Sequence, residues 1–593
     1  MYNNGSMFHR YMWTGGRVVQ KVRNNSLVVF MFFCFTIGFS ILLIKSNALV
    51  LTSDSSFHLS RVEEIFDNLK EHHFFTFIAA NTFNHTGVGN FLFYPTVFLY
   101  PWAFLRFVFN PIMSFYIWYS FFIFLTLIIS YYSMRDYSKS TIRSFIFAII
   151  YTICPYHLHL GLYNYVLGEF IAYTFLPLVF LGAYHVFWKD YKKYPLLAIG
   201  ITLLSYCHIL STYLVCLLLT VLLLGTLVYK HKLETYRLLS LAKSMALSLI
   251  LSSFIIIPFI KEFIGGSLAT PSKGFVWLTE PQQLFETSIN NIISINKSVG
   301  ILVLVTALIG WYFVKNNNFE KCIYALGIFF LAAATTLVPW QMMGHIPTIV
   351  NLIGEIQFPY RLNAYSSFFL SITGSLIIFN IIKNTNKKEI KFIILVFFVF
   401  ATFASYYGSI TTIFQRVDAT QGNYLVKNKK NVVTLPVNAF VDKNNYTNIF
   451  GYLVLNGETD YYHIQPAGKE ADYNKTIYTN QIKINNKFIQ GSPKVSANRI
   501  SYSVKVNEKR AKVDLPIISY KGTVIKNNGK IVNSTRSKRG TVLITANKGN
   551  NNISVSYDPG HLYFVSIFVS LLGWLLLGAS LILKKFNLLR FAK

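Results

Sequence analysis

One repeated pattern decides the fold class of this chain. Apolar runs of about 17 to 25 residues recur without a charged side chain, and that length matches the roughly 30 Å hydrocarbon core of a bilayer. Clear examples are Leu27–Ile44, Ser244–Ile260, Ser298–Val314, Cys322–Trp340, Leu362–Ile382, Phe392–Gly408 and Leu562–Leu583. Only 13% of the residues are charged, whereas about 25% is usual in soluble domains. We therefore predict a polytopic α-helical membrane protein with about 12–14 transmembrane helices.

The basic residues indicate the orientation of these helices. The chain carries 54 Lys and Arg against 24 Asp and Glu, a formal net charge of +30. Short basic connectors separate the apolar runs, at Lys189–Lys193, Lys230–Arg237, Lys315–Lys321, Lys383–Lys391 and Lys584–Lys593. The positive-inside rule explains them as cytoplasmic turns, so we expect no nucleic-acid partner. With Arg17, Lys21 and Arg23 before the first run, we expect both termini in the cytoplasm, including a tail of residues 1–26. The abundance of Asn, Lys, Ile, Tyr and Phe favours an AT-rich bacterial genome, so we expect the protein in a bacterial plasma membrane.

Two segments leave the number of crossings open. About thirteen segments qualify as candidates, but two cytoplasmic termini require an even number. Phe91–Phe109 is one suspect, because it contains Pro95, Pro101 and Arg106. The other is Pro195–Tyr229, which is either one long helix or two short ones.

A different pattern governs residues 411–560. Long apolar runs stop and period-two alternation begins, as in Ile500–Val506, which predicts strands. Asn528-Gly529 and Lys548-Gly549 are turn signals. We therefore predict an extracytoplasmic antiparallel β-sandwich-like domain between a helical domain at 27–410, with its first external loop at 46–90, and a last helix and basic tail at 561–593.

The first external loop carries the first candidate site. A helix starting after Ser53 would place Asp54, His58 and Arg61 on one face through the i, i+4, i+7 relation. A carboxylate, an imidazole and a guanidinium would then meet at the membrane surface. The alternative is that Asp54 only caps the helix, since Asp is favoured at that position.

Two further candidates lie beside apolar runs. Tyr165 and Glu169 precede one run, where an acid is costly unless it is paired or faces water. The alternative for Glu169 is stabilisation of the helix dipole. Gln357 and Arg361 precede another run, and an Arg fork suits phosphate oxygens. Snorkelling to lipid headgroups is the alternative for Arg361.

The sequence lacks the motifs of several common kinds of site. The five cysteines lie in or beside apolar segments and indicate neither a disulfide framework nor a thiolate metal site. His157 and His159 have a spacing unsuited to metal ligation on a helix, and His208 is expected to be a packing residue. The sequence contains no Walker-type loop, dinucleotide fingerprint, nucleophile elbow or H-E-x-x-H pair.

Taken together, these motifs resemble those of bacterial YfhO-like membrane proteins and the related tetrahydropterin-synthase-related membrane family. The resemblance rests on Asp54-x-x-x-His58-x-x-Arg61, Gly87-x-Gly89, Phe93-Tyr94-Pro95, Tyr165-x-x-Gly168-Glu169 with Pro177, Gln357-Phe358-Pro359-Tyr360-Arg361, and Leu515-Pro516 to Val555-x-Tyr557. These families in turn resemble GT-C glycosyltransferases, which take a sugar from a polyprenyl-phosphate donor and use an acid in the first external loop. The loop lacks an Asp-x-Asp pair, so a divalent cation is only a possible cofactor.

The resemblance implies a glycosyltransferase with Asp54 as the base. We assign no residue of the sequence as a metal ligand. His58, Arg61, Tyr165, Glu169, Gln357 and Arg361 are the expected substrate-binding residues. The expected partners are the bilayer, a polyprenyl-phosphate-sugar donor and a cell-envelope acceptor such as teichoic acid. The alternatives are a transporter or flippase of lipid-linked sugars, which needs no base at an acceptor hydroxyl, and a non-catalytic envelope-assembly protein.

Overall fold

The computed structural model describes residues 5–230, 234–264, 266–269, 273–294, 297–419, 423–428, 435–436, 438–454 and 456–590. Within these ranges, the side chains of residues 5–24, 230, 412, 414–419 and 584–590 are not described. The ends of the two expected cytoplasmic tails, at 1–4 and 591–593, and part of the basic turn at 231–233 lie outside the described residues.

Seven helices of the described chain are long and apolar enough to cross a membrane. They are α1 (Gly5–Ser46, apolar from Asn25), α5 (Pro111–Ser138), α8 (Leu167–Trp188), α10 (Ile209–Lys230), α18 (Asn363–Asn384), α19 (Lys388–Ala419) and α21 (His561–Arg590). Two bent pairs raise the number to nine if each is one span, namely α6 (Thr141–Thr152) with α7 (Pro155–Leu162), bent by 46°, and α11 (Thr235–Leu251) with α12 (Ser253–Phe263), bent by 75°. The protein is therefore a multi-pass membrane protein.

This number is below the expected count of about 12–14 because several predicted runs form short or broken helices. Ser244–Ile260 contains the sharp bend between α11 and α12. Ser298–Val314 yields α14 (Ile301–Val314), and Cys322–Trp340 yields α15 (Asn318–Ala333). At 1.5 Å per residue these two helices reach only about 21 to 24 Å, less than the hydrocarbon core.

The two ambiguous segments both prove to be divided. Phe91–Phe109 contains only the short helices α3 (Asn90–Phe93), η2 (Val97–Leu99) and α4 (Tyr100–Leu105), so this segment is not a continuous span. Pro101 stands in the first turn of α4, where a proline is tolerated because the N–H that it lacks has no helical partner there. Pro195–Tyr229 forms two helices, α9 (Tyr194–Ser205) and α10.

The remaining helices of the described chain are short. They are α2 (Ser55–Lys70), α13 (Pro281–Ile289), α16 (Trp340–Gly344), α17 (Pro347–Ile353) and α20 (Glu470–Tyr478), with 3-10 turns η1 (Phe83–His85), η3 (Tyr191–Lys193), η4 (Gly354–Ile356), η5 (Pro359–Leu362) and η6 (Tyr446–Gly451).

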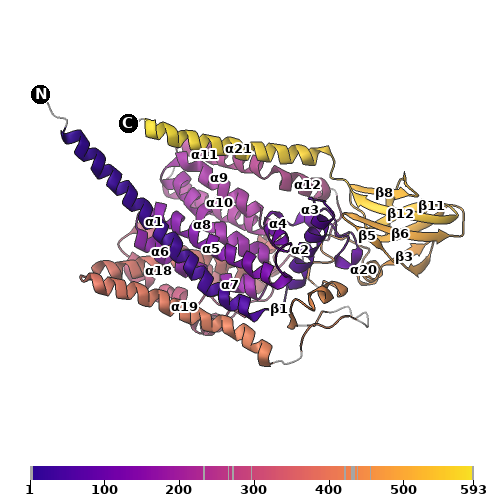
Figure 1. Ribbon diagram of the computed structural model, residues 1–593, viewed down its shortest axis with the longest axis horizontal. Helices are drawn as coiled ribbons and strands as arrows, with labels where there is room; N and C mark the ends of the chain where they lie inside the picture. Colours follow the sequence, from indigo (N-terminus) through magenta and orange to yellow (C-terminus); the bar gives the residue numbers. More distant parts are fainter. Residues whose placement is uncertain are drawn as a thin grey trace.

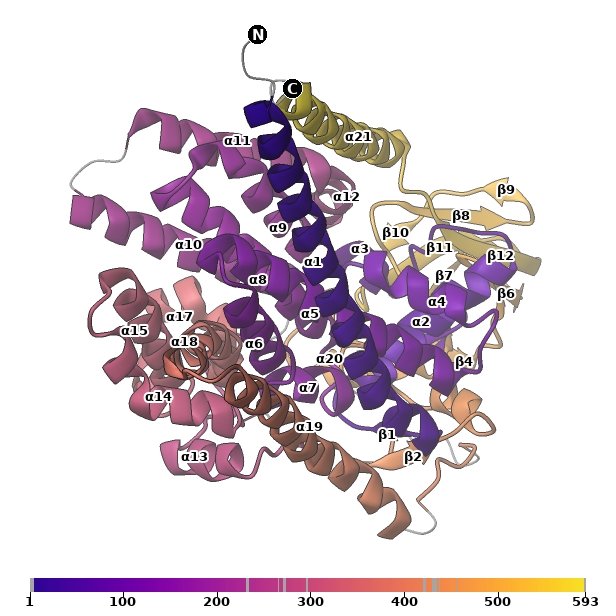
Figure 2. The ribbon, with the colours of Figure 1, turned by 60° about the vertical axis from the view of Figure 1, so that its left-hand side comes forward.

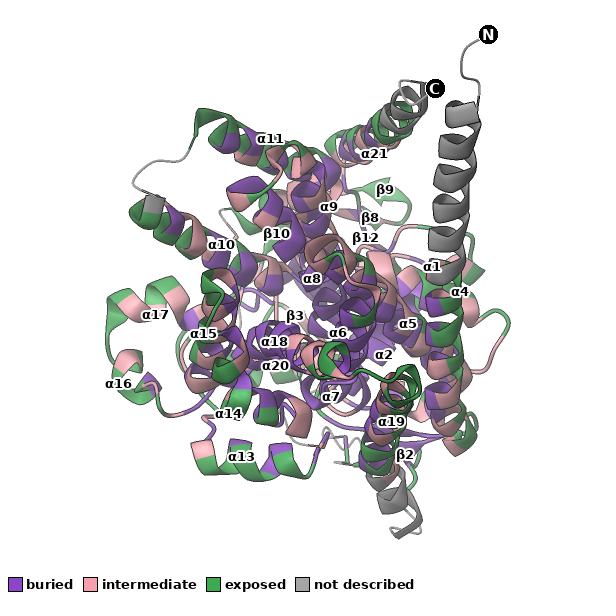
Figure 3. Cartoon of the chain, turned by 90° about the vertical axis from the view of Figure 1, so that its left-hand side faces the viewer, coloured by how far each residue is buried: buried purple, intermediate pink, exposed green. Residues whose placement is uncertain are grey.

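Helix α8 forms the centre of the bundle. In its apolar window 89% of the residues are buried, against 11% in α21, which leaves α21 on the outside for lipid (Figure 3). Pro177 cannot donate a hydrogen bond to the carbonyl of Tyr173, and the hydroxyl of Tyr151 donates to that oxygen instead at 2.7 Å. A Cβ on Gly182 would lie 2.4 Å from the backbone N of Leu197, so this glycine permits close packing of α8 on α9.

Residues 481–557, all of which are described, form two five-stranded antiparallel sheets. The strand orders are β10-β11-β7-β3-β4 and β5-β6-β12-β8-β9. The strands are β3 (Gln481–Ile484), β4 (Lys487–Gln490), β5 (Lys494–Ser496), β6 (Arg499–Val506), β7 (Ala511–Ile518), β8 (Thr523–Asn527), β9 (Lys530–Ile531), β10 (Thr535–Arg536), β11 (Thr541–Ala546) and β12 (Gly549–Tyr557). Buried residues of both sheets share one core, as in a β-sandwich.

The first turn of α1 and the last turn of α21 lie at the end of the molecule away from the β domain (Figure 1). Helix α2 lies between the bundle and this domain in both ribbon views (Figures 1 and 2). The first loop contacts the domain directly, since the backbone N of Ile518 donates to the carbonyl of Thr86 at 2.9 Å. A short strand, β1 (Leu49–Leu51), pairs antiparallel with β2 (Ala439–Val441).

Helix α12 also contacts the β domain, through the carboxylate of Glu262. Glu262 of α12 accepts hydrogen bonds from the backbone N of Lys521 at 2.9 Å and of Gly522 at 3.1 Å. It also accepts one from the hydroxyl of Tyr557 at 2.8 Å. The β domain is thus held by the first loop and by α12, which fixes its position over the end of the bundle.

Candidate functional site

Asp54 occupies the turn between β1 and α2. Its backbone N donates to the carbonyl of Asn164 at 3.2 Å, and the hydroxyl of Thr52 donates to the carbonyl of Tyr163. The residue before it, Ser53, has a φ of 36°, in the region that side chains rarely adopt. Two contacts from the segment before α8 therefore hold the backbone around Asp54 in place.

The carboxylate of Asp54 does not cap α2. Asp54 stands at the capping position, but among the described residues its side chain accepts no capping hydrogen bond from the helix. Its Oδ1 instead accepts a hydrogen bond of 3.2 Å from the hydroxyl of Ser53. The half-buried carboxylate thus makes no hydrogen bond to the first turn of α2, which is the contact that the capping alternative requires.

His58 and Arg61 follow Asp54 on α2 and are both buried. Arg61 donates through Nη2 to the backbone carbonyls of Tyr94 at 2.7 Å and Pro95 at 3.0 Å. Its Nε and Nη1, and Nδ1 of His58, find no hydrogen-bond partner in the part of the chain that is described. Burial, reinforced by the charge of Arg61, holds the pKa of His58 well below its usual value, so its imidazole is neutral.

Tyr94 links the first loop to α8. Its ring lies edge-on to His58, with centroids 5.6 Å apart, and below the guanidinium of Arg61 at 4.5 Å. A Cβ on Gly168 would come within 2.3 Å of the hydroxyl oxygen of Tyr94. The glycine next to Glu169 is therefore required for this contact, which brings α2 and α8 together.

Glu169 and Arg361 form a loose ion pair at the start of α8 and α18. Nε of Arg361 lies 3.5 Å from Oε2 of Glu169, and both side chains are largely buried. The hydroxyl of Tyr156 donates to Oε1 of Glu169 at 2.6 Å. Nη1 of Arg361 donates to the carbonyl of Ile356 at 3.0 Å and to Oε1 of Gln357 at 3.1 Å. Three of the predicted site residues thus share one network.

Asp54 belongs to the same electrostatic cluster. Burial raises the pKa of Asp54 from 3.8 to about 6, while the hydrogen bond from Ser53 and the charge of Arg361 lower it. Asp460 and Glu169 raise it again by repulsion. Residues of all three candidates therefore act on one another's charge, and Glu169 is paired with Arg361.

Tyr165 lies apart from this cluster. Its buried ring packs against Phe115 of α5, with centroids 5.5 Å apart. Its φ of 54° turns the chain into α8, and its carbonyl accepts a hydrogen bond of 2.8 Å from the backbone N of Leu167. Its place in the structure is thus that of a packing residue beside Asn164, whose carbonyl holds Asp54.

Two members of the cluster were not predicted. Asp460 reaches it from the segment before the β domain, where Glu458 accepts hydrogen bonds of 2.8 Å from Asn84 and from the backbone of Val454. His208, predicted as a packing residue, donates or accepts a 2.8 Å hydrogen bond with Ser211 and lies with its ring 5.5 Å from that of Tyr94. Only the Glu458-x-Asp460 pair offered a signal in the sequence.

The cluster leaves little free space and no ready metal site. A cavity of about 20 Å³ lies between Glu169, His208, Ser211, Arg361 and Tyr365, room for about one water molecule. Within the described ranges no group of three or more His, Cys, Asp and Glu side chains could hold a metal ion.

The fold and this cluster define a multi-pass membrane protein with charged side chains gathered at the end of its bundle nearest the β domain. A family profile described as a 6-pyruvoyl-tetrahydropterin synthase related domain, a membrane protein family, matches residues 91–411. The chain belongs to this family. The match includes Tyr165, Glu169, Gln357 and Arg361 but begins after Asp54. No curated protein matches the chain.

Proposed function

We propose that this protein is a membrane glycosyltransferase. It would move a sugar from a polyprenyl-phosphate-linked donor to a hydroxyl of a cell-envelope polymer, such as teichoic acid or another wall polysaccharide, at the outer face of the membrane. The observation that carries the proposal is the position of Asp54, a half-buried carboxylate without a capping role. Its backbone is hydrogen-bonded to Asn164, five residues before Glu169, and Glu169 is the partner of Arg361. The resemblance to YfhO-like and GT-C proteins supports the same reading.

The chemistry assigns one task to each charged group. The acceptor oxygen attacks the anomeric carbon, and its proton passes to Asp54. The bond from that carbon to the phosphate oxygen breaks, and both electrons leave with the polyprenyl phosphate. Arg361 stabilises the charge that develops on the phosphate, since a guanidinium in a water-poor site acts strongly on such charge.

The loose pair with Glu169 keeps Arg361 available for this task. At 3.5 Å from Oε2 of Glu169, Arg361 is neutralised less than a tightly paired side chain. The short bond from Tyr156 holds Glu169 in place from the other side. An incoming phosphate can therefore bind Arg361 without first breaking a close ion pair.

Replacement of Asp54 by Asn tests the proposal. We expect single-turnover transfer from a labelled polyprenyl-phosphate sugar to fall about 10² to 10⁴-fold, because the amide cannot accept a proton. Asp67→Asn is the matched control, since Asp67 lies on the same helix and pairs with Lys70 at the surface. Transfer by Asp54→Asn within about threefold of wild type, far short of a general-base contribution, would exclude Asp54 from the chemistry and favour the transporter or assembly alternatives.

The pH dependence adds a second readout. Asp54 must be ionised to accept a proton, so the wild-type rate should rise as pH increases through about 6. A raised pKa stabilises the folded protein only at low pH, and this contribution is complete below 3.8 and lost as pH rises through about 6. Asp54→Asn should therefore be as stable as wild type at pH 8, or more stable, while it fails to turn over.

A further inference from the structure

A large apolar groove lies among the helices of the bundle. Its volume is about 1000 Å³, at the upper end of the roughly 300–1,000 Å³ of ligand pockets. Its lining comes from α5, α6, α8, α10, α15 and α18 and includes Phe180, Leu181, Val221, Phe329, Phe368 and Phe369. Residues of both α10 and α15 line the groove, and α10 lies above α15 in two views of the backbone (Figures 2 and 3).

The groove extends to the end of the bundle that carries the basic turns. Tyr137 near the end of α5, Trp188 at the end of α8, Tyr229 near the end of α10 and Asn318 at the start of α15 line it. It is therefore distinct from the cluster around Asp54 and Arg361, which lies at the start of α8 and α18.

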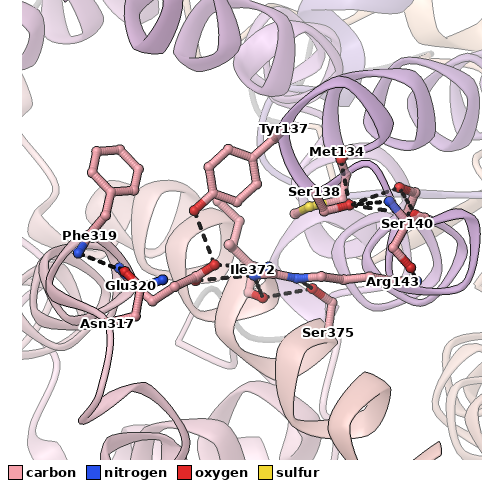
Figure 4. Close-up of polar contacts among 11 residues, drawn as sticks. Met134, Tyr137, Ser138, Ser140, Arg143, Asn317, Phe319, Glu320, Ile372 and Ser375 are labelled. Carbon is pink, nitrogen blue, oxygen red and sulfur yellow. Dashed lines mark hydrogen bonds and ion pairs between the residues drawn. The ribbon is translucent and has the colours of Figure 1, made fainter. Parts of the chain in front are cut away.

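A buried ion pair braces one wall of this groove (Figure 4). Arg143 of α6 binds Glu320 of α15 through Nη1 at 2.8 Å and Nη2 at 3.1 Å. Tyr137, which lines the groove, donates to Oε1 of Glu320 at 3.1 Å, and Arg143 donates to the carbonyl of Ile372, another lining residue, at 3.3 Å. The groove is thus held open by satisfied polar contacts behind its apolar surface.

On the side of the groove formed by α10, the space beside one glycine is empty of atoms of the described chain. Gly225 of α10 lines the groove, and a Cβ built on it meets no atom of the described chain within 4 Å. A glycine in a helix interior costs roughly 0.5–1 kcal/mol relative to alanine. The space beside Gly225 therefore belongs to the groove and is available to an occupant.

The rim of the groove has the chemistry of a lipid headgroup site. Tyr184 and Trp188 pack around Phe319 with ring centroids 5.3 and 5.5 Å apart, an arrangement typical of the membrane–water interface. Lys321 lines the groove beside them and is half-buried. In the described part of the chain no carboxylate forms an ion pair with Lys321, which contacts the amide oxygen of Asn318 at 3.3 Å. An unneutralised cation at the mouth of an apolar groove favours an amphiphile with an anionic head.

We propose that this groove binds an anionic phospholipid from the leaflet at the basic end of the bundle. Its acyl chains lie between α10 and α15, and its phosphate lies beside Lys321. Basic pockets between transmembrane helices recognise anionic headgroups in this manner. This site is independent of the proposed glycosyl transfer, because its residues are separate from Asp54, Glu169 and Arg361.

The test measures how much labelled phosphatidylglycerol or phosphatidylcholine the purified protein retains in detergent micelles. Wild type should prefer phosphatidylglycerol about fivefold, the effect of one lysine near the headgroup. Gly225→Phe should reduce retention of both lipids about tenfold, whereas Gly408→Phe, at another open glycine on α19, should not. Lys321→Gln should remove only the preference, and Lys315→Gln should keep it.

Three results would overturn the proposal. They are equal retention of the two lipids by wild type, retention by Gly225→Phe equal to that by Gly408→Phe, and displacement of phosphatidylglycerol by an equal amount of polyprenyl phosphate. The last result would assign the groove to the sugar donor instead. Thermal unfolding of each variant shows whether it is folded, and Lys321→Gln, a change at a half-buried side chain, tests the headgroup even if Gly225→Phe does not fold.

Discussion

Two buried Arg–Glu pairs differ in how closely their partners meet. Arg143 donates to the carbonyl of Ile372, about three helical turns along the chain from Arg361. Arg143 and Glu320 meet in a fork at 2.8 and 3.1 Å, with Tyr137 and the carbonyl of Ile372 completing their contacts. Arg361 and Glu169 meet once, at 3.5 Å, beside a cavity of about 20 Å³. The side chains are similarly buried, so burial alone does not distinguish a structural pair from a candidate binding site.

The difference indicates two roles for a buried charge in a membrane bundle. A closed pair leaves no capacity for another ligand and serves to hold helices together. An open pair keeps part of its electrostatic attraction for a partner that arrives later. We therefore expect the first pair to affect mainly stability and the second mainly activity, and four experiments can break or sharpen this contrast.

The largest effect is expected at the closed pair. Arg143→Gln leaves Glu320 buried with an unpaired charge and should destabilise the protein by about 3–5 kcal/mol, measured by thermal or denaturant unfolding in micelles. The double variant Arg143→Met, Glu320→Leu should recover part of this loss, because no uncompensated charge is left. A double variant less stable than either single one would show that the pair itself contributes net stability.

Arg361→Gln should reduce the rate of sugar transfer more than it reduces stability. Removal of one group that stabilises transition-state charge typically costs about 10² to 10³ in rate, while Glu169 can remain bonded to Tyr156. Arg361→Lys should keep part of the activity, since Lys keeps the charge but loses the fork. Single-turnover transfer at saturating and subsaturating donor measures both variants, and unchanged donor dependence in Arg361→Gln would contradict the phosphate role.

Tyr156→Phe should produce a smaller change. The variant removes a 2.6 Å hydrogen bond to Glu169, worth about 1.5–3 kcal/mol for a charged acceptor. Glu169 is then free to bind Arg361 more closely and to compete with the donor phosphate. The expected result is a higher KM for the donor with a nearly unchanged kcat. A lower kcat with an unchanged KM would show that Tyr156 does not act through the donor phosphate.

The smallest effect on stability and turnover is expected in a test of topology. The proposed roles of the two ion pairs depend on which end of the bundle faces outward, and the inner basic turns predict that the β domain faces outward. In a cysteine-free background, Asn444→Cys and Lys530→Cys, both at exposed positions of the polar region, should react with an impermeant thiol reagent on intact cells. Lys387→Cys, in the turn between α18 and α19, should react only after lysis, and the reverse pattern would invert the topology.

Periodicity predicted the multi-pass helical class and the β domain because both patterns are local. The breaks in helices were harder to predict, since the bend at Ser252 lies inside an uncharged run and only tertiary packing places it there. The Arg143–Glu320 pair also escaped prediction, because its members lie 177 residues apart and flank different apolar runs.

The structure groups some of the predicted site residues and separates others for a related reason. Asp54, Glu169 and Arg361 were identifiable as charges next to apolar runs, and the structure places them in one cluster. Tyr165 belongs to the same motif as Glu169, but its ring packs against Phe115. Asp460 and His208 reach the cluster through long-range packing of the first loop, α10 and the segment before the β domain. The Glu458-x-Asp460 spacing marks an acidic pair in the sequence, but it does not indicate which residues lie near that pair.

The pairing of β1 with β2 also imposes an order in time. Leu49 and Val441 are about 390 residues apart in the chain, and the turn with Asp54 directly follows β1. At the usual rate of about 5–20 residues per second, a ribosome needs roughly twenty seconds to over a minute to synthesise that interval. A nascent chain therefore carries most of its inserted helices before the strand that anchors the Asp54 turn has a partner. Assembly of this end of the protein is thus a late event in biogenesis, and a chain released before β2 would be inserted in the membrane with an incomplete site.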